Sequence, residues 1–345
     1  VLNLRGDCLA RTATNFQQGM TDKRFLELEI RAWLHSPARK RQLAAEAYYD
    51  GAQDVLHRRR VALDDDGHIK VLDHLPNNRL VNNIYAKMVD QKTNYSFGRP
   101  FSFDTEDKGY AKALNSVLGP KFRRVMRNVG EGAWIGGKCW LFPYYEGGEL
   151  AFKRFPADEV LPFWADADHT VLDAAVHVYA VLEYDETEGA KDVVKAEVMH
   201  GGGVDCFILR DDGTLEPDPE ARSGPYITAP DPETGEETGY NWERIPLVCF
   251  KSSQHEIPLP SKVKCLQDAY NSIVSNFANQ MEEDVHSTIL VIKNYDGEDL
   301  GRVRANLATY GIIKVRSFEG SEGGVDTLQI EVNSENYKTL LSILK

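Results

Sequence analysis

The spacing of hydrophobic residues divides the chain into a helical first part, a strand-rich middle and a second helical part. Before residue 135, apolar residues recur every three or four positions, which is the period of an amphipathic helix. From Lys138 to Lys251 they alternate with polar residues, as in half-buried antiparallel strands. After Pro258 the helical spacing returns. The pattern predicts an α+β protein.

Caps and breaks set the predicted element boundaries. Asp22 precedes a helical stretch, and Ser36 followed by Pro37 is the typical start of another helix. Helices are predicted within Thr21–Arg60, Leu80–Tyr95 and Tyr110–Gly132, the last with a break at Gly119–Pro120. Strands are predicted at Lys138–Tyr145, Glu149–Phe155, Val171–Tyr184, Val193–His200, Val204–Arg210 and Ile245–Lys251. The segment Pro217–Gly239, rich in proline, glycine and acid, is predicted to be a mobile loop.

The longest predicted helix runs from Ser261 to His286 and is about 39 Å long at ~1.5 Å per residue. One stripe of this helix is apolar: Val263, Leu266, Tyr270, Ile273, Phe277 and Met281. The residues that lie off that stripe are Lys262, Lys264, Gln267, Asp268, Asn271, Ser275 and Asn279. A stripe of this length needs a neighbour to cover it.

A small α/β unit is predicted after this helix. Its strands are Ile289–Lys293, Ile312–Arg316 and Val325–Val332, with a helix over Glu298–Tyr310. A last helix begins at Asn333 and stops at Lys345 on its apolar stripe, without a cap. The chain also starts at Val1 rather than Met, so we expect a processed form, a fragment or part of a longer product.

Composition narrows the class of protein. The chain has 345 residues, 42% hydrophobic and 27% charged, without an apolar run near the ~20 residues that span a bilayer. The five cysteines are scattered and form no C-x-x-C pair, which argues against a disulfide framework and a zinc site and favours a reducing compartment. The nine histidines form no metal-binding spacing. No cofactor or metal is expected.

The net charge of −13 is concentrated in one stretch. Sixteen Asp and Glu residues stand against four Lys and Arg residues between Glu183 and Gly239, a balance of −12. Tight DNA binding needs a basic surface, because affinity comes from neutralising phosphates. The chain therefore either avoids nucleic acid or handles DNA without gripping it.

Several short motifs resemble chemical sites. Gly132–Cys139 nearly matches a phosphate-binding P-loop, but Cys139 replaces the Ser or Thr that ligates magnesium, and strand rather than helix is predicted to follow. His200-Gly201-Gly202-Gly203 resembles an oxyanion-hole motif, but the chain has no G-x-S-x-G, so a turn between strands is expected. Asp64–Asp66 is interpreted as a solvated turn. The basic runs Arg58–Arg60 and Lys121–Arg124 are interpreted as helix ends or solvated faces, with phosphate contact as the alternative.

A set of segments, in their order along the chain, resembles the portal proteins of long-tailed (siphovirus-type) bacteriophages. They are Ile30–Pro37, Ala47–Gly51, Asn82–Lys92, Tyr95–Phe101, Ile245–Val248, Ile292–Glu298 and Gly323–Leu328. The resemblance implies a portal-protein fold, and the family continues beyond the point where this chain stops. By resemblance, the parts are an N-terminal helical wing (1–135), a β-rich acidic wing lobe (136–257), a first stem helix (258–286), a clip (287–332) and the start of a second stem helix (333–345).

The resemblance also implies the function. Such chains form a ring, expected to be a dodecamer, at one vertex of the capsid, and double-stranded DNA passes through it during packaging and ejection without sequence specificity. The expected partners are the terminase large subunit, a head-to-tail connector and a capsid or scaffolding protein, with no membrane. The expected location is the virion, and the host cytoplasm during assembly. The clip residues implied to dock terminase and connector are Lys293, Asn294, Tyr295, Asp296, Gly297, Gly323, Gly324, Val325 and Asp326.

No enzymatic activity is expected. Two alternatives remain open at this point: another head or tail adaptor protein, and a nucleotide-using enzyme whose only support is the defective P-loop.

Overall fold

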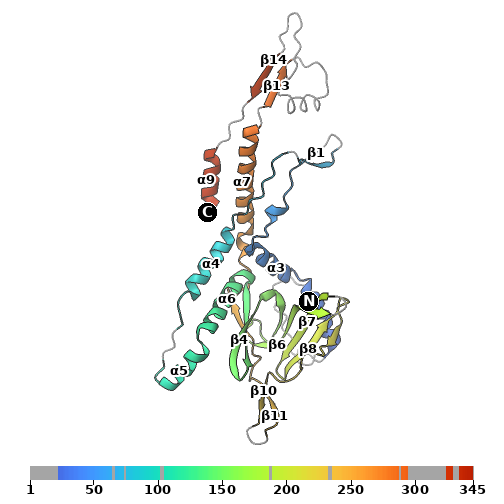
Figure 1. Ribbon diagram of the computed structural model, residues 1–345, viewed down its shortest axis with the longest axis vertical. Helices are drawn as coiled ribbons and strands as arrows, with labels where there is room; N and C mark the ends of the chain where they lie inside the picture. The colour runs from blue at the N-terminus through green and yellow to red at the C-terminus, as the bar shows by residue number, and fades with distance from the viewer. Residues whose placement is uncertain are drawn as a thin grey trace, which may run out of the picture. The chain divides into compact units, whose positions relative to one another are not determined.

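The described residues form two compact units (Figure 1). The first unit comprises the chain up to Ala52 together with Asn83–Lys264, and the second comprises Gln53–Asn82 with Cys265–Lys345. The computed structural model describes residues 22–63, 67–73, 75–101, 105–185, 189–231, 235–286, 289–293, 324–328 and 334–344. Among these residues, no helix combines the length and the apolar character needed to cross a membrane.

Two capped helices open the first unit. Helix α2 (Lys23–Leu34) starts where the Asp22 carboxylate accepts the backbone N–H groups of Arg24 and Phe25. Helix α3 (Pro37–Tyr49) starts where the Ser36 hydroxyl accepts the N–H of Arg39. Both predicted helix starts are confirmed, because each cap satisfies N–H groups that the first turn leaves unpaired.

Three more helices follow in the first unit: α4 (Ile84–Phe97), α5 (Lys108–Val117) and α6 (Pro120–Gly136). The break at Gly119–Pro120 is confirmed, with Pro120 at the first position of α6. The predicted start of α4 at Leu80 is wrong. Asn83 caps the helix by accepting the N–H of Ala86, and the residues before it are extended.

Antiparallel sheets make up the rest of the first unit. One sheet has the order β5-β6-β7-β8-β9: Val160–Trp164, Leu172–Asp185, Gly189–His200, Gly203–Leu209 and Leu215–Pro217. Another has the order β12-β3-β4: Val248–Lys251, Lys138–Glu146 and Glu149–Phe155. Sequence spacing missed β5, whose five residues have no clear alternation.

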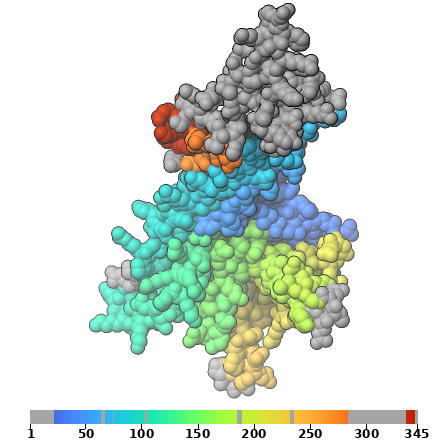
Figure 2. Space-filling view, turned by 45° about the horizontal axis from the view of Figure 1, so that its top comes forward, coloured from blue at the N-terminus to red at the C-terminus, as the bar shows by residue number. Residues whose placement is uncertain are grey.

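The prediction of a loop over Pro217–Gly239 is wrong in part. Strands β10 (Ile227–Pro230) and β11 (Glu237–Tyr240) pair as an antiparallel hairpin, which projects from the first unit (Figures 1 and 2). The mobility of this segment stays a prediction. Composition suggested a loop because proline, glycine and acid are rare in strands, yet a short exposed hairpin tolerates them.

The core of the first unit lies on both sides of the longer sheet. Leu26 and Ile30 of α2 pack against Val176 and Val198 of the sheet. Trp140 and Trp164 stack at 5.7 Å between ring centroids in a second cluster. Each fully buried side chain of this kind contributes ~1.5–3 kcal/mol, so α2 and the shorter sheet are firmly held.

The second unit is built on a long helix, α7 (Pro260–His286), whose first residues belong to the first unit. Its other elements are η1 (Asp54–His57), β1 (Val61–Leu63), β2 (Ile69–Val71), β13 (Ile289–Lys293), β14 (Gly324–Leu328) and α9 (Ser334–Leu344). The predicted α7 is confirmed, and α9 lies beside it (Figure 1), with the Phe277 and Tyr337 rings 5.0 Å apart. The predicted helix Glu298–Tyr310 and strand Ile312–Arg316 lie outside the described residues.

Candidate assembly site

One face of α7 carries a ladder of buried polar side chains. Gln267, Asn271, Ser275 and Asn279, here called the polar ladder, recur every four residues and are almost completely shielded from solvent. Residues four apart lie above one another on a helix. Uncompensated burial of such groups costs free energy, so each needs a hydrogen-bond partner.

The partner is an extended segment, residues 76–82, here called the strap. The backbone N–H of Asn78 donates to Asn279 Oδ1 at 2.6 Å, and that of Leu80 donates to Ser275 Oγ at 3.0 Å. The N–H of Asn82 donates to Asn271 Oδ1 at 3.0 Å, and Gln267 Nε2 donates to the Asn82 carbonyl at 2.7 Å. Every second strap residue therefore meets every fourth residue of the helix.

This match follows from backbone geometry. Two residues of extended chain advance about 6.6 Å, and four residues of helix advance about 6.0 Å. The two repeats stay in step over three contacts, with the strap running opposite to α7. Asn271 Nδ2 also donates to Gln53 Oε1, so the first residue of the stretch Gln53–Asn82 is bound to the same ladder.

The opposite face of α7 is apolar and only partly covered. Tyr270 is buried, and its hydroxyl accepts a hydrogen bond from Asn82 Nδ2 at 3.2 Å. Val263, Ile273 and Phe277 are half-buried, whereas Leu266 and Met281 are 51% and 48% exposed. The six predicted packing residues thus share one helix, but their role in packing between subunits stays a prediction.

The hairpin β1–β2 carries a second uncovered apolar face. Its register sets Val61 opposite Val71 and Leu63 opposite Ile69, so these four side chains line one face. Leu63 and Ile69 are 71% and 72% exposed. The sequence pattern of this region predicted only a turn at Asp64–Asp66, which lies outside the described residues. Three-residue strands are too short for alternation to reveal them.

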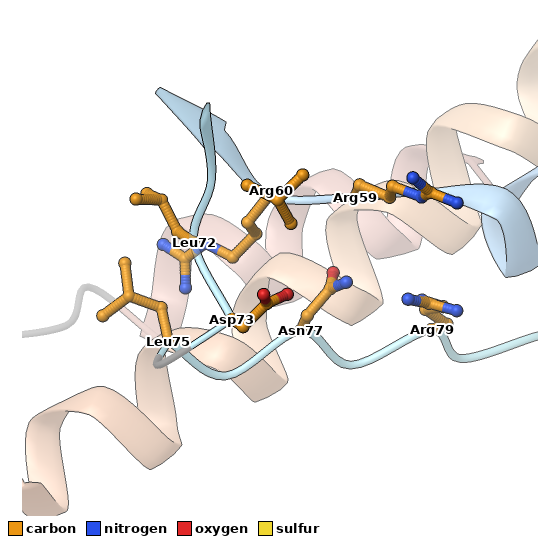
Figure 3. A pocket seen from close by; sticks show the side chains of 8 residues that line it. Arg59, Arg60, Leu72, Asp73, Leu75, Asn77 and Arg79 are labelled. Atoms are coloured by element: carbon orange, nitrogen blue, oxygen red, sulfur yellow. The ribbon is translucent and has the colours of Figure 1, made fainter. Parts of the chain in front are cut away.

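The arginines of the run Arg58–Arg60, at the base of this hairpin, make different contacts. Arg58 is turned to α7, where its Nη2 donates to Asn276 Oδ1 at 2.6 Å. Arg59 and Arg60 line a hollow of about 520 Å³ (Figure 3). The other lining residues are Val71, Leu72, Asp73, Leu75, Asn77 and Arg79. Arg60 donates to the Pro76 carbonyl and Arg79 to the Leu56 carbonyl, so both guanidinium groups help to hold the backbone of the stretch Gln53–Asn82.

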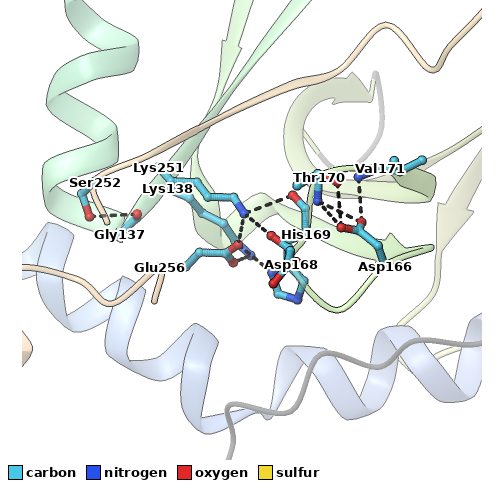
Figure 4. A network of polar contacts seen from close by, with 10 residues as sticks. All are labelled: Gly137, Lys138, Asp166, Asp168, His169, Thr170, Val171, Lys251, Ser252 and Glu256. Atoms are coloured by element: carbon cyan, nitrogen blue, oxygen red, sulfur yellow. Dashed lines mark hydrogen bonds and ion pairs between the residues drawn. The ribbon is translucent and has the colours of Figure 1, made fainter. Parts of the chain in front are cut away.

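A cluster of charged side chains in the first unit fixes the chain just before α7 (Figure 4). Glu256 is bonded to Lys138 Nζ at 2.8 Å, Lys251 Nζ at 2.8 Å and His169 Nδ1 at 2.6 Å. These four residues are here called the Glu256 cluster. Burial alone would raise the pKa of Glu256, but the charge and hydrogen bond of Lys138, helped by Lys251 and His169, lower it from 4.5 to about 2.

The P-loop-like stretch contributes to this cluster rather than to a nucleotide site. Gly132–Gly136 ends α6, and Lys138 starts β3, so a helix precedes the stretch and a strand follows it. A P-loop has the reverse order. Gly137 adopts a φ of +83°, and a side chain there would collide with the Glu256 backbone. The turn at His200–Gly203 joins β7 to β8, as expected.

The predicted clip residues are only partly described. Lys293 pairs with Gly324, Ile292 with Val325, and Val291 with Asp326 in the antiparallel pair β13–β14. The structure thus brings Lys293, Gly324, Val325 and Asp326 together. Asn294, Tyr295, Asp296, Gly297 and Gly323 lie outside the described residues.

The buried polar groups described above hold segments of the backbone, and the α7 face and the β1–β2 hairpin expose apolar side chains. No group of His, Cys, Asp and Glu residues suited to a metal ion occurs in the described part of the chain.

Comparison with known proteins gives the family. The profile of the family described as "Phage portal protein, SPP1 Gp6-like" matches residues 35–345. The chain is 27% identical over 345 residues to the portal protein of Clostridium phage phiCD119, covering 93% of this chain and 70% of that protein. It is 28% identical over 288 residues to the portal protein of Bacillus phage SPP1, covering 83% of this chain and 54% of that protein.

The chain therefore belongs to the SPP1 Gp6-like family of phage portal proteins. This family consists of structural components of the virion and not of enzymes, which decides against the nucleotide-using alternative. It also favours a portal over another head or tail adaptor. The chain spans about half of the SPP1 protein and 70% of the phiCD119 protein.

Proposed function

We propose that this chain is a subunit of a portal ring, expected to be a dodecamer, at one vertex of a phage capsid. Double-stranded DNA passes through its channel during packaging and ejection. The observation that carries the proposal is the family match over residues 35–345. In this proposal α7 is the first stem helix and α9 begins the second, the first unit holds the wing, and β13–β14 belongs to the clip.

The apolar face of α7 supports assembly through the stem. Leu266 and Met281 remain about half exposed, and Ile273 lies between them along the helix. The strap covers the polar side of α7, and α9 contacts the apolar face only at Phe277 among the described ring contacts. We assign the part of this face that stays exposed to the contact between neighbouring subunits. A ring repeats each contact at every interface, so a modest contact acts many times.

Passage of DNA calls for weak binding. The acidic excess between Glu183 and Gly239 disfavours a tight grip on phosphates, and a ring that holds DNA weakly lets it slide. In this proposal the terminase large subunit supplies the energy and docks at the clip. A head-to-tail connector takes its place after filling, and a capsid or scaffolding protein surrounds the ring. The location is the virion, and the host cytoplasm during assembly.

The test is the assembly state of the 345-residue chain. We expect negative-stain images to show rings with a central hole, and light scattering after size exclusion to give a multiple of the 38.8 kDa chain mass. Ile273→Asp places a charge in the apolar face and is expected to abolish rings. Leu182→Asp, at an exposed site of the first unit, is the matched control.

Folding of the first unit can be followed separately. All five tryptophans, Trp33, Trp134, Trp140, Trp164 and Trp242, lie in that unit. We expect Ile273→Asp to leave the thermal transition in tryptophan fluorescence unchanged. Unfolding of the whole chain would identify α7 as an ordinary core helix, and intact rings would show that this face does not join subunits.

A further inference from the structure

The β1–β2 hairpin has the structure of an element that lacks a covering partner. Its two strands have three residues each, and no third strand pairs with either of them among the described residues. An isolated two-stranded sheet is only marginally stable in water. Moreover, all four aliphatic side chains of its apolar face are exposed: Val61, Leu63, Ile69 and Val71.

The base of the hairpin, in contrast, is firmly held. Arg58 bonds to Asn276 on α7, Arg60 to the Pro76 carbonyl and Asn77 Nδ2 to the Arg58 carbonyl. The strap that follows is fixed to the polar ladder through the N–H groups of Asn78 and Leu80. The second unit therefore presents a weakly paired apolar ribbon on a rigid base, as a docking arm requires.

The same unit carries a second apolar face, on the opposite side of α7 from the polar ladder, and this face is only partly covered, by Tyr337 of α9 at Phe277. Its exposed members are Leu266 and Met281, and Ile273 is half-buried between them. The described residues of the hairpin stand away from α7 in Figure 1. Two different apolar faces on one chain are what a head-to-tail contact needs, because one surface of each copy meets the other surface of the next.

We infer that the apolar face of the β1–β2 hairpin of one copy docks on the apolar face of α7 in the adjacent copy. The inference rests on the proposed ring, since a ring places an identical neighbour beside every subunit. The charges agree with this pairing. Ala62 and Lys70 occupy the other face of the hairpin, so its apolar face has no charged side chain, and Leu266, Ile273 and Met281 are uncharged. Apolar surfaces of this kind associate by removal from water.

Two double variants separate the two halves of the contact. Leu63→Ser with Ile69→Ser disables the hairpin, and Leu266→Ser with Met281→Ser disables the α7 face. Leu182→Ser with Tyr184→Ser, at exposed positions of β6, is the matched control for loss of surface apolarity. Since all six positions are exposed, we expect the thermal transitions of the unassembled chains to stay close to that of the wild type.

The measurement is mass photometry together with light scattering after size exclusion, at one fixed concentration. We expect each disabled variant to lose rings at least about tenfold, as a weakened contact shifts the assembly equilibrium, while the control assembles like the wild type. A mixture of the two disabled variants should form 1:1 heterodimers that grow no further. In that pair, the intact hairpin of one chain meets the intact α7 face of the other.

Native mass spectrometry with one variant labelled with ¹⁵N identifies such heterodimers. Rings of normal abundance in the hairpin variant would overturn the inference and leave the portal proposal standing. Dimers formed by the α7 variant alone would show a hairpin-to-hairpin contact and also overturn it. A wild-type chain that stays monomeric would remove both proposals.

Discussion

The polar ladder and the Glu256 cluster are both buried polar networks that hold backbone segments, but they use different chemistry. The ladder consists of neutral amides and a hydroxyl that bind N–H and carbonyl groups of the strap. The Glu256 cluster consists of one carboxylate between two ammonium groups and an imidazole. The first network is indifferent to pH in the range where proteins stay folded, whereas the second depends on one ionised group.

The two kinds of network hold the backbone in different ways. Many small hydrogen bonds in step with two backbone repeats define a register along α7. A single buried charge with several partners fixes one point, the turn where Gly137 meets the backbone of Glu256. Loss of one ladder contact weakens the attachment of the strap to α7. Loss of the Glu256 charge leaves the ammonium groups of Lys138 and Lys251 without their counter-charge.

The largest effect is expected from Glu256→Gln. It leaves the shape unchanged but removes the counter-charge of Lys138 and Lys251, both largely buried. Breaking a buried ion pair on one side costs ~3–5 kcal/mol. We expect the urea transition in tryptophan fluorescence, which reports the first unit, to shift by that amount. The matched change Glu237→Gln, in an exposed pair with Arg222, should cost less than about 1 kcal/mol. Equal effects would contradict the role assigned to the cluster.

Acid should weaken the same cluster. Because the folded-state pKa of Glu256 is lowered from 4.5 to about 2, its ionised form stabilises the fold fully above pH 4.5. This contribution is lost as the pH falls from about 4.5 to about 2 and amounts to about 3 kcal/mol. The difference in unfolding free energy between wild type and Glu256→Gln should therefore shrink between pH 7 and pH 3. A constant difference would show that the charge of Glu256 is not responsible.

A smaller effect is expected from Asn271→Ala in the ladder. This change leaves the N–H of Asn82 and the side chain of Gln53 without their bonds to Asn271, at a cost of about 2–3 kcal/mol. Hydrogen exchange of the strap amides should accelerate by roughly 30- to 150-fold, since each ~1.4 kcal/mol is a factor of ten. The tryptophan transition of the first unit should not move.

Two serine variants test whether hydrogen exchange of the strap depends on the ladder contacts that are lost. Ser275→Ala removes one ladder contact and should accelerate exchange at Leu80 by less than Asn271→Ala does. Ser272→Ala lies on the same helix outside the ladder and should have no effect. Equal exchange in all three variants would mean that side chains of α7 do not hold the strap.

The alternation and spacing of apolar residues by themselves determined much of the secondary structure. They predicted α7, the caps at Asp22 and Ser36, and the strands β3 and β4. These signals are local, because a cap or an alternation acts within a few residues. The resemblance of short segments was likewise sufficient for the family.

Only the tertiary structure decided what the polar side of α7 does and where α4 begins. Leu80 and Val81 have helical spacing, yet they are extended because Ser275 and Asn271 satisfy the backbone of the strap. Gln267, Asn271, Ser275 and Asn279 have the sequence pattern of a solvated face, and they are buried because that backbone covers them. A hydrogen bond between residues about 190 positions apart leaves no periodic signal in the sequence, since its partner is a backbone group that every residue carries.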